Sequence, residues 1–163
     1  MPVSEEFKHT VGKAIGRIPS GVYIVTAAHN GEATAMMASW VQQAAFDPPA
    51  VSVAIAKERP IGEMITASKK LALSILPEGD TSLMKRYARG IKPGEVAFTG
   101  VETITSPAGI PVLAASLAWI EGIVLLSCDF GGDHDLLIAE ITAGAVLKPG
   151  PAFTHQRGSG FHY

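Results

Sequence analysis

Hydrophobic residues recur at every second position over short stretches of this chain, and this period predicts β-strands. The first strand is expected over residues 21–28, which read GVYIVTAA. Asn30 and Gly31 then form a signature of a tight hairpin turn, so residues 33–45 should return as a second strand. Later strands are predicted at 50–56, 71–76, 113–119, 120–129 and 134–147.

Three segments have helical spacing instead. In the first, apolar residues recur on one face and Ser4 is placed to cap the helix, which we expect to run to about Arg17. Two shorter helices are predicted at 61–68 and 82–88, the second capped by Asp80 or Thr81.

Short turns and short helices together decide the fold class. A doubly wound α/β sheet needs a helix of about ten or more residues between successive strands, and that spacing is missing. Residues 89–110 are rich in Gly, Pro and Thr and predict an excursion over the surface. The pattern therefore predicts an all-β fold with short helices, built as an antiparallel β-barrel.

Composition narrows the class of protein. The 163 residues are expected to form one domain, 1–163, and a hydrophobic content of 47% with 17% charged residues argues against disorder. A net charge of −2 gives no reason to expect nucleic acid, and no apolar run is long enough to span a membrane. Cys128 is the single cysteine, so an internal disulfide is excluded. We expect a cytoplasmic protein that covers part of its surface with a second copy.

The most unusual segment is 34–49, which reads TAMMASWVQQAAFDPP. It carries small residues, amides and a hydroxyl where an ordinary strand would carry Val, Ile or Phe. Small residues let a flat ligand approach the backbone, and the polar groups can bond its edge. A strand at a subunit contact is the alternative. If the strand is regular, Thr34, Met36, Ala38, Trp40 and Gln42 share one face, and Ala35, Met37, Ser39, Val41 and Gln43 share the other.

Two cations, Lys57 and Arg59, follow the strand 50–56 directly. They point the same way if the strand continues that far, and they could then clamp a phosphate. A solvated strand end is the alternative. The simplest ligand with a flat head and an anionic tail is flavin mononucleotide (FMN).

A second unusual block places His134 just beyond Gly131 and Gly132. Asp133, His134 and Asp135 are consecutive, so in a strand their side chains alternate and they would chelate one metal ion poorly. A histidine at a strand mouth suits contact with a flat ligand, and a turn histidine bonded to backbone is the alternative.

Three blocks in this order resemble the flavin reductase-like family of FMN-binding split β-barrels: 19–26, 34–49 and the Gly132-Asp133-His134 motif. The amino-acid sequence of 34–43, followed by Ala-Lys-Glu-Arg at 56–59, is most similar to the flavin reductase module of cyanobacterial flavodiiron proteins. Many family members have serines where this chain has Ala38-Ser39 and Ala45-Phe46, so the flavin contacts differ in detail.

The resemblance implies a six-stranded antiparallel Greek-key barrel that forms a homodimer, with one flavin per subunit near the interface. It implies FMN, or FAD in its place, as cofactor and NAD(P)H as co-substrate; no metal is expected, because residues 133–135 alternate in direction. His134 would lie near the flavin or the nicotinamide, as the catalytic candidate. The implied flavin-binding residues are Thr34, Ala35, Met36, Met37, Ala38, Ser39, Trp40, Gln42, Gln43, Lys57 and Arg59.

The expected function is that of an FMN-dependent NAD(P)H:flavin oxidoreductase. Hydride transfer needs the two rings held at reacting distance, which is a positioning task rather than acid–base chemistry. Two alternatives stay open: an FMN-carrying electron-transfer module that does not oxidise nicotinamide, and a β-barrel that binds no cofactor.

Overall fold

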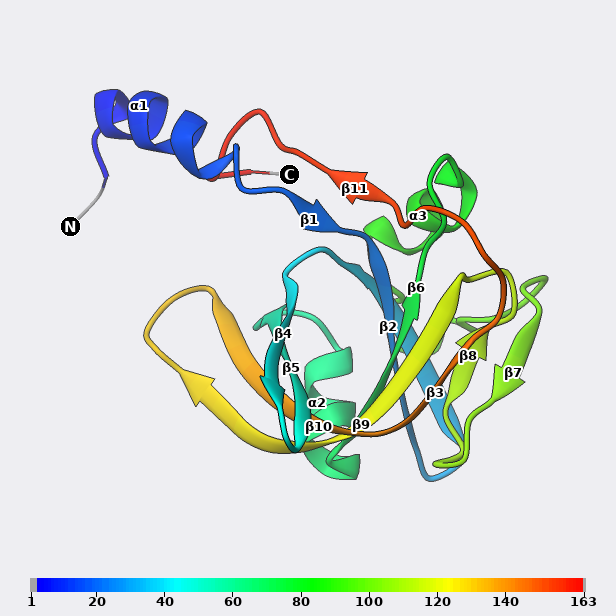
Figure 1. Cartoon of the computed structure of the whole chain (residues 1–163). Helices are drawn as coiled ribbons and strands as arrows, with labels where there is room; N and C mark the ends of the chain where they lie inside the picture. Colours follow the sequence, from blue (N-terminus) through cyan, green and yellow to red (C-terminus); the bar gives the residue numbers. More distant parts are fainter. Residues whose placement is uncertain (1–2, 163) are drawn as a thin grey trace.

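One antiparallel sheet forms the body of the protein (Figure 1). The computed structural model describes residues 3–162, and over this range the sheet has seven strands. The predicted antiparallel, mostly β architecture with short helices is confirmed. In spatial order the strands are β3 (Glu32–Ala38), β2 (Tyr23–His29), β6 (Lys70–Ile75), β9 (Ala118–Asp129), β10 (His134–Val146), β5 (Pro49–Ala56) and β4 (Val41–Phe46).

The sheet curls so that its two edge strands meet. β3 and β4 lie at opposite edges, but only Ser39 and Trp40 separate them in the chain. The Ala54 N–H donates to the Trp40 carbonyl at 3.0 Å and ties this crossing to β5. Strands from both halves of the sheet then share one buried core, which includes Val25, Val53, Leu73 and Leu137.

The predicted second strand, 33–45, is therefore wrong as a single element. The chain leaves the ladder at Ser39 and Trp40, and the second half pairs with β5 instead of β2. If β3 and β4 formed one element, the sheet would have the six strands that the family resemblance implies, so this division accounts for the seventh. It also means that the alternation of faces predicted for 34–43 does not carry across Trp40.

The chain also differs from the prediction between residues 111 and 129. The expected strand 113–119 is replaced by β8 (Pro111–Leu113), a turn, and the start of β9. The Ser116 hydroxyl donates to the Leu113 carbonyl at 2.6 Å, so the serine satisfies the backbone of the turn. β8 pairs with β7 (Thr103–Thr105), which lies within the predicted surface excursion.

Two of the helices close the barrel. α2 (Ile61–Ser68) inserts Ile61 and Ile65 into the main core. α3 (Thr81–Ala88) is capped by Asp80, whose carboxylate accepts from the Ser82 N–H at 3.1 Å. Both helices match their predicted positions.

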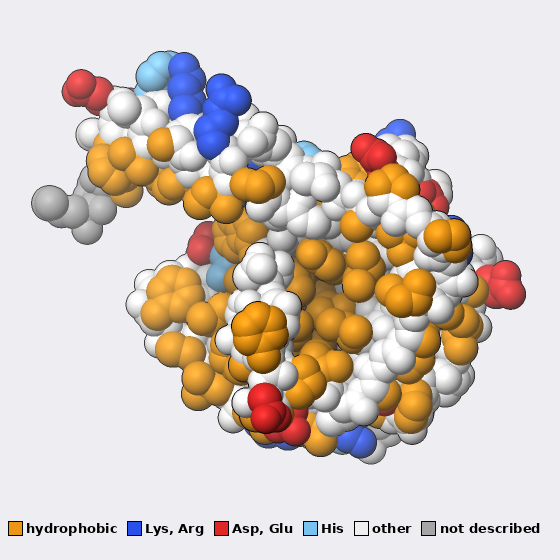
Figure 2. All heavy atoms as spheres, in the orientation of Figure 1, with side chains coloured by type: hydrophobic (Ala, Val, Ile, Leu, Met, Phe, Trp, Pro, Cys, Tyr) orange, Lys and Arg blue, Asp and Glu red, His pale blue; other side chains and the backbone are white. Residues whose placement is uncertain are grey.

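The first helix and the described segment near the C-terminus lie side by side, outside the barrel (Figure 1). α1 (Glu5–Ile15) is capped by Ser4 as predicted, but it ends before Arg17. β1 (Ser20–Gly21) pairs with β11 (Thr154–His155), so the segment that follows β10 runs back along α1. Figure 2 shows hydrophobic side chains along the side of α1 that faces the barrel.

Candidate functional site

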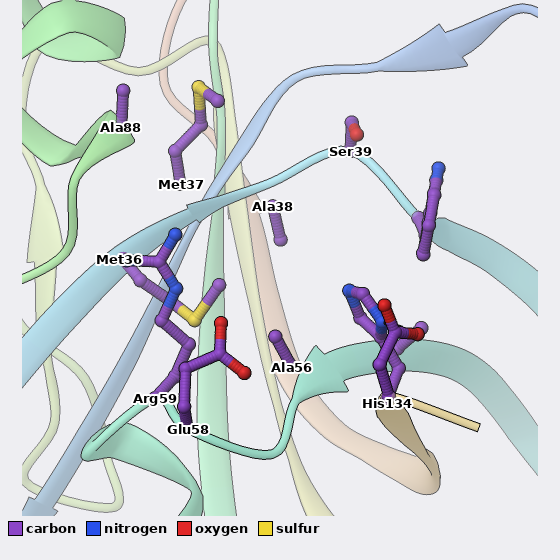
Figure 3. A pocket seen from close by; sticks show the side chains of 12 residues that line it. Met36, Met37, Ala38, Ser39, Ala56, Glu58, Arg59, Ala88 and His134 are labelled. Carbon is purple, nitrogen blue, oxygen red and sulfur yellow. Dashed lines mark hydrogen bonds and ion pairs between the residues drawn. The ribbon is translucent and has the colours of Figure 1, made fainter. Parts of the chain in front are cut away.

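A pocket of about 240 Å³ lies where β3 ends, beside the end of β5. Its walls come from β3 and the Ser39–Trp40 crossing, from β5 and the loop after it, from the end of α3, and from the start of β10. In Figure 3, Arg59 and Glu58 lie on one side of this pocket and His134 on the other, with Ala38 and Ala56 between them. The pocket thus has a charged end, a small-residue floor and a histidine.

The floor is made by the outer face of β5. Val51, Val53 and Ile55 point into the core, so the residues that alternate with them, including Ala54 and Ala56, point the other way. Both alanines line the pocket. A methyl group is the smallest side chain that an L-residue can present, so the β5 backbone stays close to whatever occupies the pocket.

Arg59 is held across the pocket from the loop after β5. Its Nη1 donates to the Arg89 carbonyl at 2.5 Å, at the C-terminal end of α3, where a cation is favoured by the helix dipole. The backbone of Gly90 has φ +74°, and a side chain there would meet Arg59 Nη1 at 2.8 Å, so this position favours glycine. Arg59 Nε is buried and has no hydrogen-bond partner among the described residues. A buried N–H in this state is a donor available to an anionic ligand.

Lys57 lies elsewhere, so the geometric premise of the predicted clamp fails. β5 ends at Ala56 and a turn follows, so Lys57 and Arg59 do not point the same way. Lys57 lines a second pocket, between β5 and α2, and its Nζ lies 2.7 Å from Asp129 Oδ1. The hydrogen bond with Asp129 raises the pKa of Lys57, and the same bond lowers the pKa of Asp129.

His134 faces the first pocket because β10 pairs with β5. His134 is the partner of Ala56 in the ladder, and residues directly opposite share a face. His134 as a residue is only 7% exposed, and its ring lies 4.6 Å from the Trp40 ring, centroid to centroid. His134 Nδ1 lies 2.8 Å from Asp133 Oδ1, and this hydrogen bond lowers the pKa of Asp133.

Two carboxylates, Glu58 and Asp133, also line the pocket, and both residues are exposed. Asp133 is already bonded to His134, and water screens an exposed carboxylate strongly. Arg59 therefore remains the group best placed to receive an anion.

The pocket collects most of the predicted site residues. Seven of them line it: Met36, Met37, Ala38, Ser39, Trp40, Arg59 and His134. The other five lie outside it. Ala35 is buried in the core beside α3, Thr34 lines a separate groove, Gln42 and Gln43 are exposed on β4, and Lys57 lies in the second pocket. A role for these five in flavin binding stays a prediction.

Sequence reasoning missed several lining residues. Ala54 and Ala56 had a usable signal, since they are small residues at alternate positions of a strand otherwise rich in Val and Ile. Glu58 lies between the two cations, and an exposed carboxylate after a strand is too common to indicate a site. Ala88 carried no signal, because only the packing of α3 brings it to the pocket.

Other kinds of site find no support in the described residues. Within 3–162, no three His, Cys, Asp or Glu side chains gather closely enough to hold a metal ion. None of the helices in that range is long and apolar enough to cross a membrane.

Comparison with known proteins identifies the family. Residues 15–160 match the model of the flavin reductase like domain, and the chain belongs to this family. Diflavin flavoprotein A 1 of Synechocystis sp. is 40% identical over 153 residues, which cover 93% of this chain and 26% of that protein. The chain thus spans about a quarter of the length of the curated relatives that it matches.

Solved structures agree with the fold. The NADH:FAD oxidoreductase SgcE6 of Streptomyces globisporus C-1027 superposes with a TM-score of 0.84 at 23% identity, covering 97% of this chain and 93% of that one. The flavin reductase PheA2 gives a TM-score of 0.76 at 26% identity, covering 94% of this chain and 98% of that one. The chain is thus a flavin reductase-like domain, related to diflavin proteins and similar in fold to oxidoreductases.

Proposed function

We propose that this chain is an FMN-dependent NAD(P)H:flavin oxidoreductase whose flavin site is the pocket between Arg59 and His134. The observation that carries the proposal is the buried Arg59 Nε, which has no partner within residues 3–162 and lies at one end of a floor of alanines. A flavin phosphate would accept from this N–H, and the alanines would leave room for the flat ring against the β5 backbone. When bound, the flavin would supply the hydride-accepting chemistry.

The residues of this chain would bind and orient. Arg59 would hold the anionic tail and fix the direction in which the ring lies. Backbone N–H groups near Ala38 and Ser39 would bond the polar edge of the ring, since small side chains leave them accessible. His134 would form the wall on the side where the nicotinamide enters. FAD would share the same flavin head, so the pocket does not separate FMN from FAD.

A homodimer is part of the proposal. The pocket is smaller than the roughly 300–1,000 Å³ of most ligand sites, so a flavin would extend beyond it. The outer half of β9 and the neighbouring turns expose apolar side chains that a second copy would cover, notably Leu125, Leu126 and Phe130. Sedimentation of the wild type should give the mass of a dimer, and Leu126→Glu should shift it toward monomer. A monomeric wild type at micromolar concentration would contradict this part.

The deciding experiment is anaerobic titration of the flavin-loaded protein with NADH and, separately, NADPH. Bleaching of the flavin absorbance by either nucleotide within seconds supports the oxidoreductase. His134→Ala should slow this bleaching more than it weakens FMN binding. A protein that binds FMN but is bleached by neither nucleotide would exclude the proposed reaction.

A second candidate is an electron-transfer module that receives electrons from a protein donor. It is favoured by the match to only about a quarter of the diflavin flavoprotein from Synechocystis sp.. Flavin binding without bleaching by nicotinamide is the result expected of this module. A preparation that binds no flavin at all would exclude both candidates.

A further inference from the structure

The C-terminal segment reaches the pocket through one side chain. Arg157 places its guanidinium carbon 4.9 Å from the centroid of the Trp40 ring, a cation–π contact. The same Trp40 ring contacts the ring of His134. Both Trp40 and His134 line the pocket, whereas Arg157 does not.

Two hydrogen bonds and one ring contact hold the segment that carries Arg157 against α1 and the residues just after it. The Gln156 side chain donates to the Arg17 carbonyl at 3.0 Å, and the Gly160 N–H donates to the Gly12 carbonyl at 2.7 Å. Phe161 packs edge-on against Phe7 with ring centroids 6.4 Å apart. Arg157 is therefore anchored on both sides by a unit made of α1 and the C-terminal segment.

Gly16 makes this close approach possible. A Cβ at Gly16 would lie 2.7 Å from the carbonyl oxygen of Arg157, which is too close for any side chain. Gly16 itself has φ −59°, which residues with a side chain adopt without strain. A larger residue is therefore excluded at this position by contact with the C-terminal segment and not by backbone strain. The position of Arg157 thus depends on a residue that does not line the pocket.

We propose that Arg157 is a positioning residue of the flavin site: it holds the Trp40 ring, and Trp40 sets the orientation of the His134 ring at the pocket wall. This inference rests on the proposed function, because His134 matters there as the wall that meets the nicotinamide. An aromatic contact prefers a limited set of offset and tilted geometries, so fixing one ring restricts the other. The terminal unit thereby becomes part of the site although it lies outside the barrel.

The test uses three variants of the full chain and one control. Arg157→Met removes the charge and keeps the length, Arg157→Lys keeps the charge, and Gly16→Ala displaces the C-terminal segment without touching the pocket. Gly62→Ala is the control, since it lies in α2 with open space around its Cβ. Trp40 emission is isolated by subtracting the matching spectrum of each protein with Trp40→Phe, because the chain has only two tryptophans.

The first readout is acrylamide quenching of Trp40 in flavin-free protein. Quenching should increase in Arg157→Met and Gly16→Ala, return toward wild type in Arg157→Lys, and stay unchanged in Gly62→Ala. The second readout is stopped-flow reduction of the bound flavin. In Arg157→Met and Gly16→Ala, reduction of the bound flavin should be about three- to ten-fold slower, in line with the strength of one cation–π contact. The FMN affinity of both variants should stay at the wild-type value.

Unchanged quenching in both Arg157→Met and Gly16→Ala would overturn the proposal. Increased quenching with an unchanged reduction rate would overturn it too, because Arg157 would then hold Trp40 without consequence for the site. If NADH and NADPH fail to bleach even the wild type, the proposed function fails. Whether Arg157 fixes the Trp40 ring is then decided by the difference in acrylamide quenching between wild type and the variants, a measurement that needs no electron donor.

Discussion

The end of β5 has a pocket on each of its two sides: the outer pocket, which contains Arg59 and His134, and the α2-side pocket, which contains Lys57. The two pockets differ in which of their charged groups has no hydrogen-bond partner. On the outer side, Arg59 has a buried N–H without a partner among the described residues. On the side of α2, Lys57 is already paired with Asp129, and the group that finds no partner in the described part of the chain is an acceptor, Asp135 Oδ1. An unpaired donor attracts an anion and an unpaired acceptor repels one. Two cations that are only two residues apart in the sequence therefore have different expected roles.

Filling the outer pocket should have the largest effect. Ala54→Leu places a branched side chain on its floor, where the flavin ring would lie. FMN affinity should fall about a hundred-fold or more in a fluorescence titration, since tightly packed sites tolerate added methylenes poorly. Ala67→Leu, which adds the same volume to the α2-side pocket, should leave FMN affinity unchanged. Equal losses in both variants would mean that the pockets have been assigned wrongly.

Removing the two cations in turn tests the comparison directly. Arg59→Met should weaken FMN binding about ten- to a hundred-fold, because a hydrogen bond to a charged group contributes about 1.5–3 kcal/mol. Lys57→Met should change FMN affinity about two-fold at most, because Lys57 lies in the other pocket. Its exposed ion pair with Asp129 also contributes little to the free energy of the fold. Isothermal titration of both variants side by side gives the ratio. A larger loss of FMN affinity for Lys57→Met than for Arg59→Met would mean that the flavin phosphate binds in the α2-side pocket.

The sequence predicts most strands of the main sheet, the two closing helices and most of the pocket residues, because these depend on local periodicity and composition. It fails at Trp40, where an alternating pattern cannot show that the chain crosses from one edge of the sheet to the other. It fails again at Lys57, where a spacing of two suggests a shared direction although the strand has already ended. The contribution of Ala88 and of Arg157 depends on contacts between segments far apart in the chain, which no local pattern encodes.

A smaller effect is expected from Glu58, the carboxylate beside Arg59 in the outer pocket (Figure 3). Glu58→Gln removes a like charge near the proposed phosphate position. FMN affinity should rise about two- to three-fold at low salt, and the gain should vanish near 1 M salt, where screening acts within about 3 Å. Glu63→Gln, on the α2-side pocket, is the matched control and should have no effect on binding. A gain that persists at high salt would indicate a change of structure instead of electrostatics.

The smallest effect concerns the Lys57–Asp129 pair itself. The pKa of Asp129 is lowered in the folded protein, so its contribution to stability is present above the unfolded pKa of about 4 and is lost as pH falls through the folded value. The pKa of Lys57 is raised, so its contribution is present below the unfolded pKa of about 10.4 and is lost as pH rises through the folded value. The difference in Tm between wild type and Lys57→Met should therefore be small, steady at neutral pH, and absent in strong acid. Lys85→Met, which removes an exposed lysine with no ion pair among the described residues, should show no such pH dependence. A Tm difference that survives in acid would mean that Lys57 stabilises the fold through packing, and its ammonium would then be available to a ligand after all.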